Sequence, residues 1–512
     1  MTRHQSTYPP WFFIAVLLAV VAVPGCDEVK LEENGGGAPT PLLQPGTLTS
    51  NMTLHGLASI FEVTHPEGFA VQGEPQPDKM VGGHEVALRG IDQKIDVSRV
   101  QASVKNDDLQ LTVTSDTPSL TLTAKLTAPL QFCRFQIGAE RLTIKETVTN
   151  IAPGNWRLRV APKQSRNIDM FRLEIRSVNS CPRMTDENGD VISELRPLLV
   201  EHLERSVAAG MDDYVDISLF EEFGLLEGTH SLTRLSPFSN RRGAVRLVSN
   251  IPEEDGVTLN EDGLLANVNV GVSSKRAACA PPVDLDTPED TPADPVTGED
   301  LAADGKADAG LALAKPLMAR LVQAATLGGF MCRGLDSRTL MGGDNISRHD
   351  ARLGEIGLES LPISSPLEPV VSTGELPKLE LRAANESIDL VWKNLTVELY
   401  GEVSGARVRL LTLETNVTFN LRPVSPASVS MSSLELDLET IEVTEGVTLR
   451  SPWKNGDQKA VGLKQWTQRL LHLVFEDSFS LPLPVAPSAP LDLVHTQVRE
   501  NDLMLLFEIE TP

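Results

Sequence analysis

The clearest hydrophobic pattern lies near the C-terminal end of the chain, over residues 460–477. Apolar side chains recur there on one helical face, at Val461, Leu463, Trp466, Leu470 and Val474. This spacing predicts an amphipathic helix of about four turns. The prolines of the following phrase, SFSLPLP at 478–484, exclude both a continued helix and a central strand. Two apolar runs, 491–494 and 503–509, then predict two closing strands.

Two more segments have helical periodicity. In 195–208, one face carries Leu195, Leu198, Leu199, Leu203 and Val207. The segment 315–327 begins with Lys315-Pro316, a favourable helix start, and stops at Gly328-Gly329. Its predicted face carries Leu317, Leu321, Ala324 and Ala325.

Alternation of apolar and polar residues predicts strands in both halves of the chain. The first-half patterns are 109–113, 120–126, 168–170 and 173–175, and the second-half patterns are 395–399, 413–421 and 434–438. Short strand patterns also occur over 220–270, between the halves.

The order of these elements resembles the bactericidal/permeability-increasing and lipid-transfer protein family of the tubular lipid-binding (TULIP) superfamily. The residues that carry the resemblance are the helix at 460–477, the F-x-L-P-L-P phrase, the closing strands, and Gly271-Val272-Ser273 as the opening of a second unit. The resemblance implies an α+β fold, with two elongated antiparallel β-barrels, each wrapped around a long amphipathic helix and joined by a central sheet. The family's opening helix has no evident counterpart between Thr47 and Gly90, where prolines break every long pattern.

These elements predict an order of domains along the chain. We expect a signal peptide over 1–25, a flexible tether over 26–46, an N-terminal barrel over 47–219, a central sheet or linker over 220–270, and a C-terminal barrel over 271–512. The acidic, proline-rich stretch 281–310 is expected to be a disordered insert. It lacks the residue order of a calcium-binding loop.

The N-terminus predicts export. An apolar run of 13 residues, Trp11–Val23, is short for a membrane span and ends at Val23-Pro24-Gly25-Cys26. This ending resembles a bacterial lipobox, which implies cleavage before Cys26 and acylation of that cysteine. The alternatives are an ordinary signal peptide or an uncleaved anchor. We expect a membrane-anchored envelope lipoprotein, on the periplasmic face or the outer surface.

Four cysteines remain after Cys26: Cys133, Cys181, Cys279 and Cys332. An even number in an oxidising compartment favours two disulfides, and their wide spacing is unlike a zinc site. Four cysteines allow three connectivities; we favour Cys133–Cys181 and Cys279–Cys332, because each pair then lies within one half of the chain.

Composition and motifs narrow the function. The formal net charge of −25 argues against nucleic acid or an anionic membrane surface as a broad electrostatic partner. Aromatic residues make up 4% of the chain, so apolar burial must be mostly aliphatic. The sequence contains no nucleophile elbow, P-loop, H-E-x-x-H or dinucleotide-binding motif. We therefore expect no enzyme, cofactor or metal site, although scattered carboxylates leave an enzyme open.

The sequence thus favours an envelope-anchored lipoprotein that binds and transfers phospholipid-like amphiphiles in apolar grooves. The candidate groove residues are Leu317, Leu321, Trp466 and Leu470, although any one of them fits a filled core as well. The competing hypothesis is a structural or adhesive surface lipoprotein of tandem β-sandwiches without a lipid cavity. Sandwich arrays need no long amphipathic helices, so the placement of helices discriminates between the two.

Overall fold

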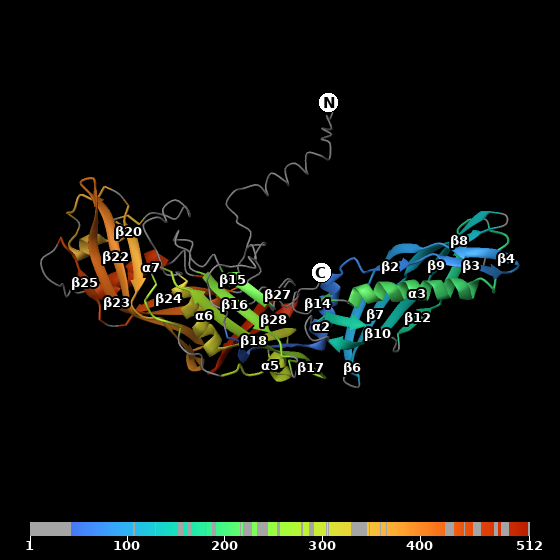
Figure 1. Ribbon diagram of the computed structural model, residues 1–512, viewed down its shortest axis with the longest axis horizontal. Coiled ribbons are helices and arrows are strands. Elements are labelled where there is room, and N and C mark those ends of the chain that lie inside the picture. The colour runs from blue at the N-terminus through green and yellow to red at the C-terminus, as the bar shows by residue number, and fades with distance from the viewer. Residues whose placement is uncertain are drawn as a thin grey trace, which may run out of the picture.

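A computed structural model describes residues 42–509, apart from 106–107, 128–129, 152–156, 161–165, 180, 187–190, 216, 219–227, 233–243, 253–255, 278–279, 286–290, 304, 306, 329–345, 348, 359, 365, 425–434, 445, 454–461, 476–479 and 483–490. The molecule is elongated, with two halves at opposite ends of a central sheet (Figure 1). The predicted signal peptide and Cys26 lie outside the described residues, as do Cys279 and Cys332.

The central sheet contains strands from distant parts of the chain. Its order is β15-β16-β18-β1-β19-β28-β27, and β17 pairs with β18. The bounds are β1 Gln44–Met52, β15 Gly228–Leu232, β16 Ala244–Asn250, β17 Val257–Asn260, β18 Gly263–Lys275, β19 Ala309–Ala314, β27 Leu491–Val498 and β28 Asp502–Ile509. The sheet is therefore not made from 220–270 alone, because the first and last described strands also belong to it. β18 is one continuous strand across position 270.

A repeated pattern is centred on the pair β1 and β19. These strands are antiparallel, with Leu48 opposite Leu313 and Met52 opposite Ala309. Each leads directly into a helix: β1 into α2 (Leu54–Thr64) and β19 into α6 (Lys315–Leu327). Because the strands run in opposite directions, the two helices leave the sheet at opposite ends. β18 flanks β1 as β28 flanks β19, so the two halves of the chain repeat the same strand–helix start.

The N-terminal half is built from three antiparallel sheets and the helices α2 and α3 (Arg196–Val215). A six-stranded sheet contains β6 Arg99–Lys105, β7 Asp108–Asp116, β10 Arg141–Ile151, β11 Arg157–Val160, β12 Asn167–Phe171 and β14 Ile217–Ser218. A five-stranded sheet contains β3 Gln76–Val81, β4 His84–Leu88, β8 Ser119–Leu126, β9 Gln131–Gly138 and β13 Glu174–Ser177. β2 (Phe69–Gly73) pairs with β5 (Ile91–Ile95).

The C-terminal half contains one seven-stranded sheet and the helices α6 and α7 (Leu463–Phe475). Its strands are β20 Glu368–Thr373, β21 Lys378–Arg382, β22 Ser387–Val403, β23 Ala406–Val424, β24 Glu435–Val443, β25 Thr448–Arg450 and β26 Ser480–Pro482. The helices and strands predicted from periodicity are confirmed in position, with β13 and β24 each beginning one residue later than its pattern.

The fold is mostly β with few helices, in several sheets, and among the described strands none of the sheets closes into a barrel. The expectation of two barrels is therefore wrong in this respect. Long amphipathic helices lie against sheets in both halves, which tandem β-sandwiches would not need. This arrangement favours the helix-containing interpretation over the sandwich interpretation.

A helix does occupy the stretch where the sequence indicated none. α2 spans Leu54–Thr64, and the Thr53 hydroxyl caps it by accepting a hydrogen bond from the amide of Gly56 at 2.9 Å. Leu57, Ile60 and Phe61 are buried. The prolines that appeared to exclude a helix begin only after its last residue. At 11 residues, the helix is too short to produce a long periodic pattern in the sequence.

The acidic stretch 281–310 was expected to be disordered, and this expectation is wrong for its described part. Residues 298–303 form the helix α5 (Gly298–Ala303), and Ala309 already lies in β19. Val296 and Leu301 are 1% and 2% exposed within the core. Burial of these two apolar side chains offsets the entropy lost on ordering the segment.

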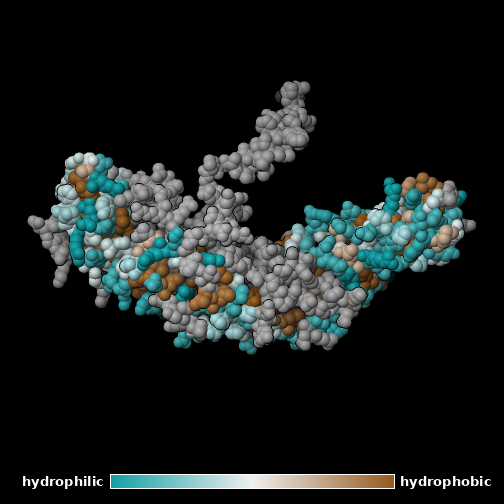
Figure 2. Space-filling view, in the orientation of Figure 1, coloured by the Kyte–Doolittle hydropathy of each residue, from teal (hydrophilic) through white to brown (hydrophobic). Residues whose placement is uncertain are grey.

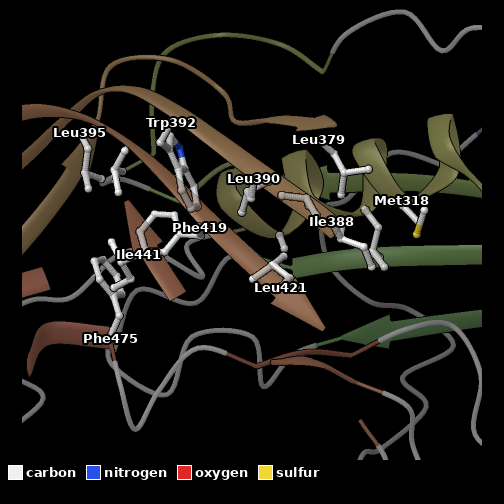
Figure 3. Packing of buried hydrophobic residues seen from close by; sticks show 14 of the residues in the cluster. Met318, Leu379, Ile388, Leu390, Trp392, Leu395, Phe419, Leu421, Ile441 and Phe475 are labelled. Carbon is white, nitrogen blue, oxygen red and sulfur yellow. The ribbon is translucent and has the colours of Figure 1, made fainter. Parts of the chain in front are cut away.

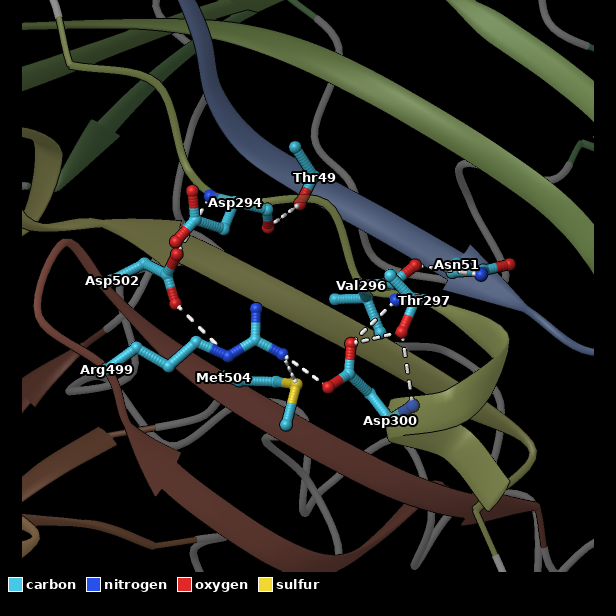
Figure 4. A network of polar contacts seen from close by, with 9 residues as sticks. All are labelled: Thr49, Asn51, Asp294, Val296, Thr297, Asp300, Arg499, Asp502 and Met504. Atoms are coloured by element: carbon cyan, nitrogen blue, oxygen red, sulfur yellow. Dashed lines mark hydrogen bonds and ion pairs between the residues drawn. The ribbon is translucent and has the colours of Figure 1, made fainter. Parts of the chain in front are cut away.

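Polar contacts attach this segment to the central sheet (Figure 4). The side-chain amide of Asn51 donates to the carbonyl of Val296 at 2.9 Å, and the Thr49 hydroxyl donates to the carbonyl of Asp294 at 3.1 Å. Asp300 forms an ion pair with Arg499 at 2.9 Å. Asp300 also accepts hydrogen bonds from Thr297, whose hydroxyl accepts from the Asp300 amide in return, which is a capping box. The charges that predicted disorder are thus partly used in specific contacts.

Asp308 joins the start of α2 to the last strand. Its side chain accepts a hydrogen bond from the Ile509 amide at 3.0 Å and lies 2.9 Å from Nδ1 of His55. Its main-chain carbonyl accepts from both the amide and the hydroxyl of Thr53, at 2.8 and 3.1 Å. A Cβ at position 56 would lie 2.6 Å from this carbonyl, which explains Gly56.

We expect D308A to lower the free energy of unfolding by about 1–3 kcal/mol, because the Ile509 amide loses its acceptor in a buried site. D308N keeps a side-chain oxygen and should lose less. Urea unfolding of the two variants beside the wild type measures the difference. Equal stability of D308A and the wild type would contradict this role of Asp308.

Candidate functional site: an apolar seam beneath helix α3

α3 is held against β2 by small residues. A Cβ at Gly210 would lie 1.9 Å from the carbonyl oxygen of Ala70, and one at Gly73 would lie 2.0 Å from the Ser206 hydroxyl. Such close approach fixes one side of the helix against the strand. The buried Ser206 hydroxyl donates to the carbonyl of His202 at 2.8 Å, so it is satisfied within the helix.

Buried polar groups also position α3. Nε2 of His202 lies 3.0 Å from the carbonyl oxygen of Arg89, and burial lowers the pKa of His202. Near the end of the helix, Asp212 and the buried Glu146 of β10 both pair with Arg166. Burial raises the pKa of Glu146, and the Arg166 guanidinium opposes that shift. The helix is therefore tied both to the β2–β5 side and to the six-stranded sheet.

An aromatic cluster fills the space at the end of α3 nearest the central sheet. The Tyr214 ring packs against the rings of His65, Phe61 and Phe69 at centroid distances of 4.6, 6.0 and 5.8 Å. Burial is the main reason why the pKa of Tyr214 is strongly raised. Further along the helix, aliphatic Leu203 and Val207 are buried against the sheets.

The chain crosses three times between the six-stranded sheet and the five-stranded sheet. These crossovers lie between β7 and β8, β9 and β10, and β12 and β13. The Thr117 amide donates to the Glu140 carbonyl at 3.1 Å, and the Glu140 amide donates to the Phe171 carbonyl at 3.0 Å. Thr117 and Arg172 have φ values of 53° and 54°, in the left-handed region, where the chain turns from one sheet to the other.

Beneath these crossovers, an apolar seam remains between the two sheets and α3. Its cavity volume is small, about 20 Å³, and it is partly open to solvent. The lining residues are Ile95, Pro118, Leu120, Ile137, Gly138, Ala139, Leu142, Met170, Leu173, Leu203 and Val207. The floor is buried, and includes Leu203 and Val207 on one face of α3. The mouth is half-exposed at Pro118, Ala139 and Leu173.

The seam has no ionisable side chain in its lining. A ligand would therefore be bound there through burial of apolar surface. Charged groups lie at the crossovers beside the mouth, where exposed Arg172 pairs with Glu140 at 2.5 Å. An aliphatic tail in the seam would leave an attached polar group beside this pair and in water. The geometry suits an amphiphile rather than a fully polar ligand.

The expected disulfide between Cys133 and Cys181 is confirmed, with a Cα–Cα distance of 5.8 Å. It ties β9, which supplies Ile137 and Gly138 to the seam, to the segment after β13. Asn179 adds two hydrogen bonds to β9: its side chain accepts from the Arg134 amide at 2.7 Å and donates to the Phe132 carbonyl at 2.8 Å. The second expected pair lies outside the described residues.

The four candidate groove residues lie elsewhere. Leu317 and Leu321 of α6, and Trp466 and Leu470 of α7, are at most 2% exposed and belong to the core of the C-terminal half. The Trp466 indole N–H donates to the carbonyl of Ala351 at 2.8 Å. None of the four borders the seam. Of the seam residues, Leu203 and Val207 were indicated by their helical spacing, and Leu120, Met170 and Leu173 belong to strand patterns predicted from the sequence.

The described residues contain neither a cluster suited to a metal ion nor a membrane-spanning helix. No group of three or more His, Cys, Asp or Glu side chains in this part of the chain is placed to hold a metal ion. Of the described helices, none has the length and apolar character needed to cross a membrane.

Apolar side chains gather at the outer tip of the N-terminal half, around the ends of β3, β4, β8 and β9 (Figure 2). Met80, Leu130 and Phe132 are 70%, 64% and 40% exposed. The Arg89 guanidinium lies over the Phe132 ring, 4.4 Å from its centroid. Clusters of exposed apolar residues commonly mark surfaces that contact other molecules.

No protein-family model and no curated protein matches this sequence. Among solved structures, a lipopolysaccharide binding protein is similar at 14% identity and a TM-score of 0.42, covering 92% of this chain and 99% of that one. P47 from Clostridium botulinum A2 and P47 of Clostridium botulinum E1 are similar at 9% and 8% identity, each with a TM-score of 0.22. They cover 90% and 92% of this chain, and 97% and 100% of their own. These similarities are too weak to transfer a function.

Proposed function

We propose that this protein is a TULIP-like lipoprotein of the bacterial cell envelope that binds, and passes on, lipid-like amphiphiles. The observation that carries the proposal is the apolar seam beneath α3, with a buried aliphatic floor and a half-exposed mouth. Each methylene moved from water into such a site contributes about 0.8 kcal/mol. The ligand is bound non-covalently, and acylated Cys26 anchors the chain to the membrane.

The position of the seam supports uptake of an amphiphile by its tail. α3 is fixed by close contacts with β2, so the helix face that borders the seam is held in place without a ligand. The three crossovers form the mouth, and their charged side chains remain in solvent beside it. A tail can therefore enter while the polar group stays outside.

A substitution at the mouth tests this function. We expect A139F to abolish amphiphile binding, because Ala139 lines the mouth and a phenyl ring would occupy the seam. A209F is the matched control, since Ala209 is an exposed residue of α3. Full-length protein, purified in a mild detergent, is incubated with a brominated long-chain fatty acid and examined by native mass spectrometry, where the bromine isotope pattern identifies the adduct.

The expected result is an adduct on the wild type and A209F and none on A139F. The far-ultraviolet circular dichroism of all three proteins checks that they are folded. Wild-type protein that takes up no fatty acid would contradict the proposal, as would folded A139F that binds as well as A209F.

A further inference from the structure

The space between helix and sheet in the C-terminal half is filled by aromatic rings. Trp392 of β22, Phe419 of β23 and Phe475 of α7 are 0%, 0% and 2% exposed. The Trp392 and Phe419 centroids are 5.5 Å apart with rings at 84°, and those of Phe419 and Phe475 are 5.2 Å apart at 85°. Figure 3 shows the three rings in succession, with Ile441 and Leu395 beside them. We call these three residues the aromatic plug.

The interior of the C-terminal half differs from that of the N-terminal half in its side chains. In both halves an amphipathic helix packs on antiparallel strands, α3 in the first and α7 in the second. The middle of α3 presents Leu203 and Val207, and its aromatic cluster is confined to the end near Tyr214. In the C-terminal half, edge-to-face rings from two strands and the helix occupy the interior. Such ring pairs are favourable beyond their burial alone.

The Trp392 indole reinforces this interpretation. Its N–H is buried and has no hydrogen-bond partner among the described residues. A buried donor without a partner is unfavourable, so the side chain contributes here through its volume and ring contacts. The Trp392 side chain thus serves to fill space in the core.

The size of the seam also limits what enters it. Its cavity volume of about 20 Å³ lies far below the roughly 300–1,000 Å³ typical of sites that enclose a whole drug-sized ligand. Fully buried side chains of both sheets and of α3 bound its floor. A ligand therefore enters only by displacing side chains around the seam, and one aliphatic tail displaces fewer of them than two.

We propose that the protein holds one single-chain amphiphile, such as a fatty acid or a lysophospholipid, in the N-terminal seam alone, and that the aromatic plug makes the C-terminal half structural. The inference rests on the proposed function and specifies its ligand class and stoichiometry. Leu317, Leu321, Trp466 and Leu470 are then core residues and not groove residues.

The test counts bound tails by native mass spectrometry of the full-length protein, with a brominated long-chain fatty acid as the probe. We expect about one fatty acid on the wild type and none on A139F. F419A removes the central ring of the plug, so it should bind about two, and A139F/F419A about one. L399A is the control for loss of core volume, because Leu399 is equally buried in β22 but lies seven positions from Trp392. It should remain at about one.

F475L opens the same space with a smaller loss of volume, and it replaces F419A if that variant does not fold. Dioleoylphosphatidylcholine is the two-chain probe and should give no adduct on the wild type. Two fatty acids on the wild type, an unchanged count in folded F419A or F475L, or a stoichiometric phosphatidylcholine adduct would each overturn this inference. These outcomes leave the proposed function standing, whereas no fatty acid on the wild type would overturn the function itself.

Discussion

R166M should lower the free energy of unfolding by about 3–5 kcal/mol at neutral pH, because it leaves Glu146 buried and ionised without its partner. The Glu146 side chain is 1% exposed, and Arg166 joins it to Asp212 of α3. The substitution therefore removes the positive charge that compensates buried Glu146. It also removes the link between the six-stranded sheet and α3.

The effect of R166M should depend on pH. Burial raises the pKa of Glu146 in the folded protein above its usual value, and loss of Arg166, which opposes this shift, raises it further. Below the unfolded-state pKa, Glu146 is protonated in both states and the variant loses little through this charge. As pH rises from there through the raised folded pKa, the unfolded state releases the proton first, so stability falls. The deficit is largest at neutral pH.

Urea unfolding at about pH 4 and pH 7 measures this dependence. The matched control is R176M, which removes the exposed pair of Arg176 with Glu174 and should change stability little. E146Q/R166M removes both charges and should recover much of the loss at neutral pH. A loss in R166M that is equal at both pH values would show that its origin is packing rather than the charge of Glu146.

Periodicity located the long helices because each has one apolar face that repeats over several turns. The residues of α3 and α7 that were expected to face inward, among them Leu203 and Trp466, are buried. α2 was missed because it covers only 11 residues and is followed at once by His65-Pro66. Its local signal was Thr53 as an N-cap before Leu57, Ile60 and Phe61.

The acidic segment shows why average composition misleads over a short stretch. Its net charge indicated disorder, but Val296 and Leu301 supply apolar anchors, and Thr297-x-x-Asp300 is a capping-box sequence. The cation that pairs with Asp300 is Arg499, almost two hundred positions away. No local pattern in the sequence predicts a partner so distant in the chain.

The seam could be predicted only in part, for a related reason. Its lining runs from Ile95 to Val207 and combines five strands, three crossovers and a helix. Each side chain has the pattern of an ordinary core residue. The difference between an aliphatic floor that leaves space and an aromatic plug that fills it depends on which residues meet across the sheets, and Trp392, Phe419 and Phe475 meet only in the folded chain.

Removal of the disulfide by C133A/C181A should lower the free energy of unfolding by about 4 kcal/mol. The two cysteines are 48 residues apart in the chain. In the chain-entropy model, opening a loop of this length restores about 4 kcal/mol of unfolded-state entropy at room temperature. Because β9 contributes Ile137 and Gly138 to the seam, the variant should also bind the brominated fatty acid more weakly.

Urea unfolding of the variant and of the oxidised wild type measures the loss, and wild-type protein reduced with dithiothreitol provides the control. The reduced wild type and the variant should unfold at similar urea concentrations, both well below the oxidised protein. C279A/C332A, which leaves Cys133–Cys181 intact, separates the effect of this bond from that of the other two cysteines. If the oxidised and reduced forms of C279A/C332A unfold together, the disulfide does not stabilise the N-terminal half, and the hydrogen bonds from Asn179 are sufficient to hold β9 in place.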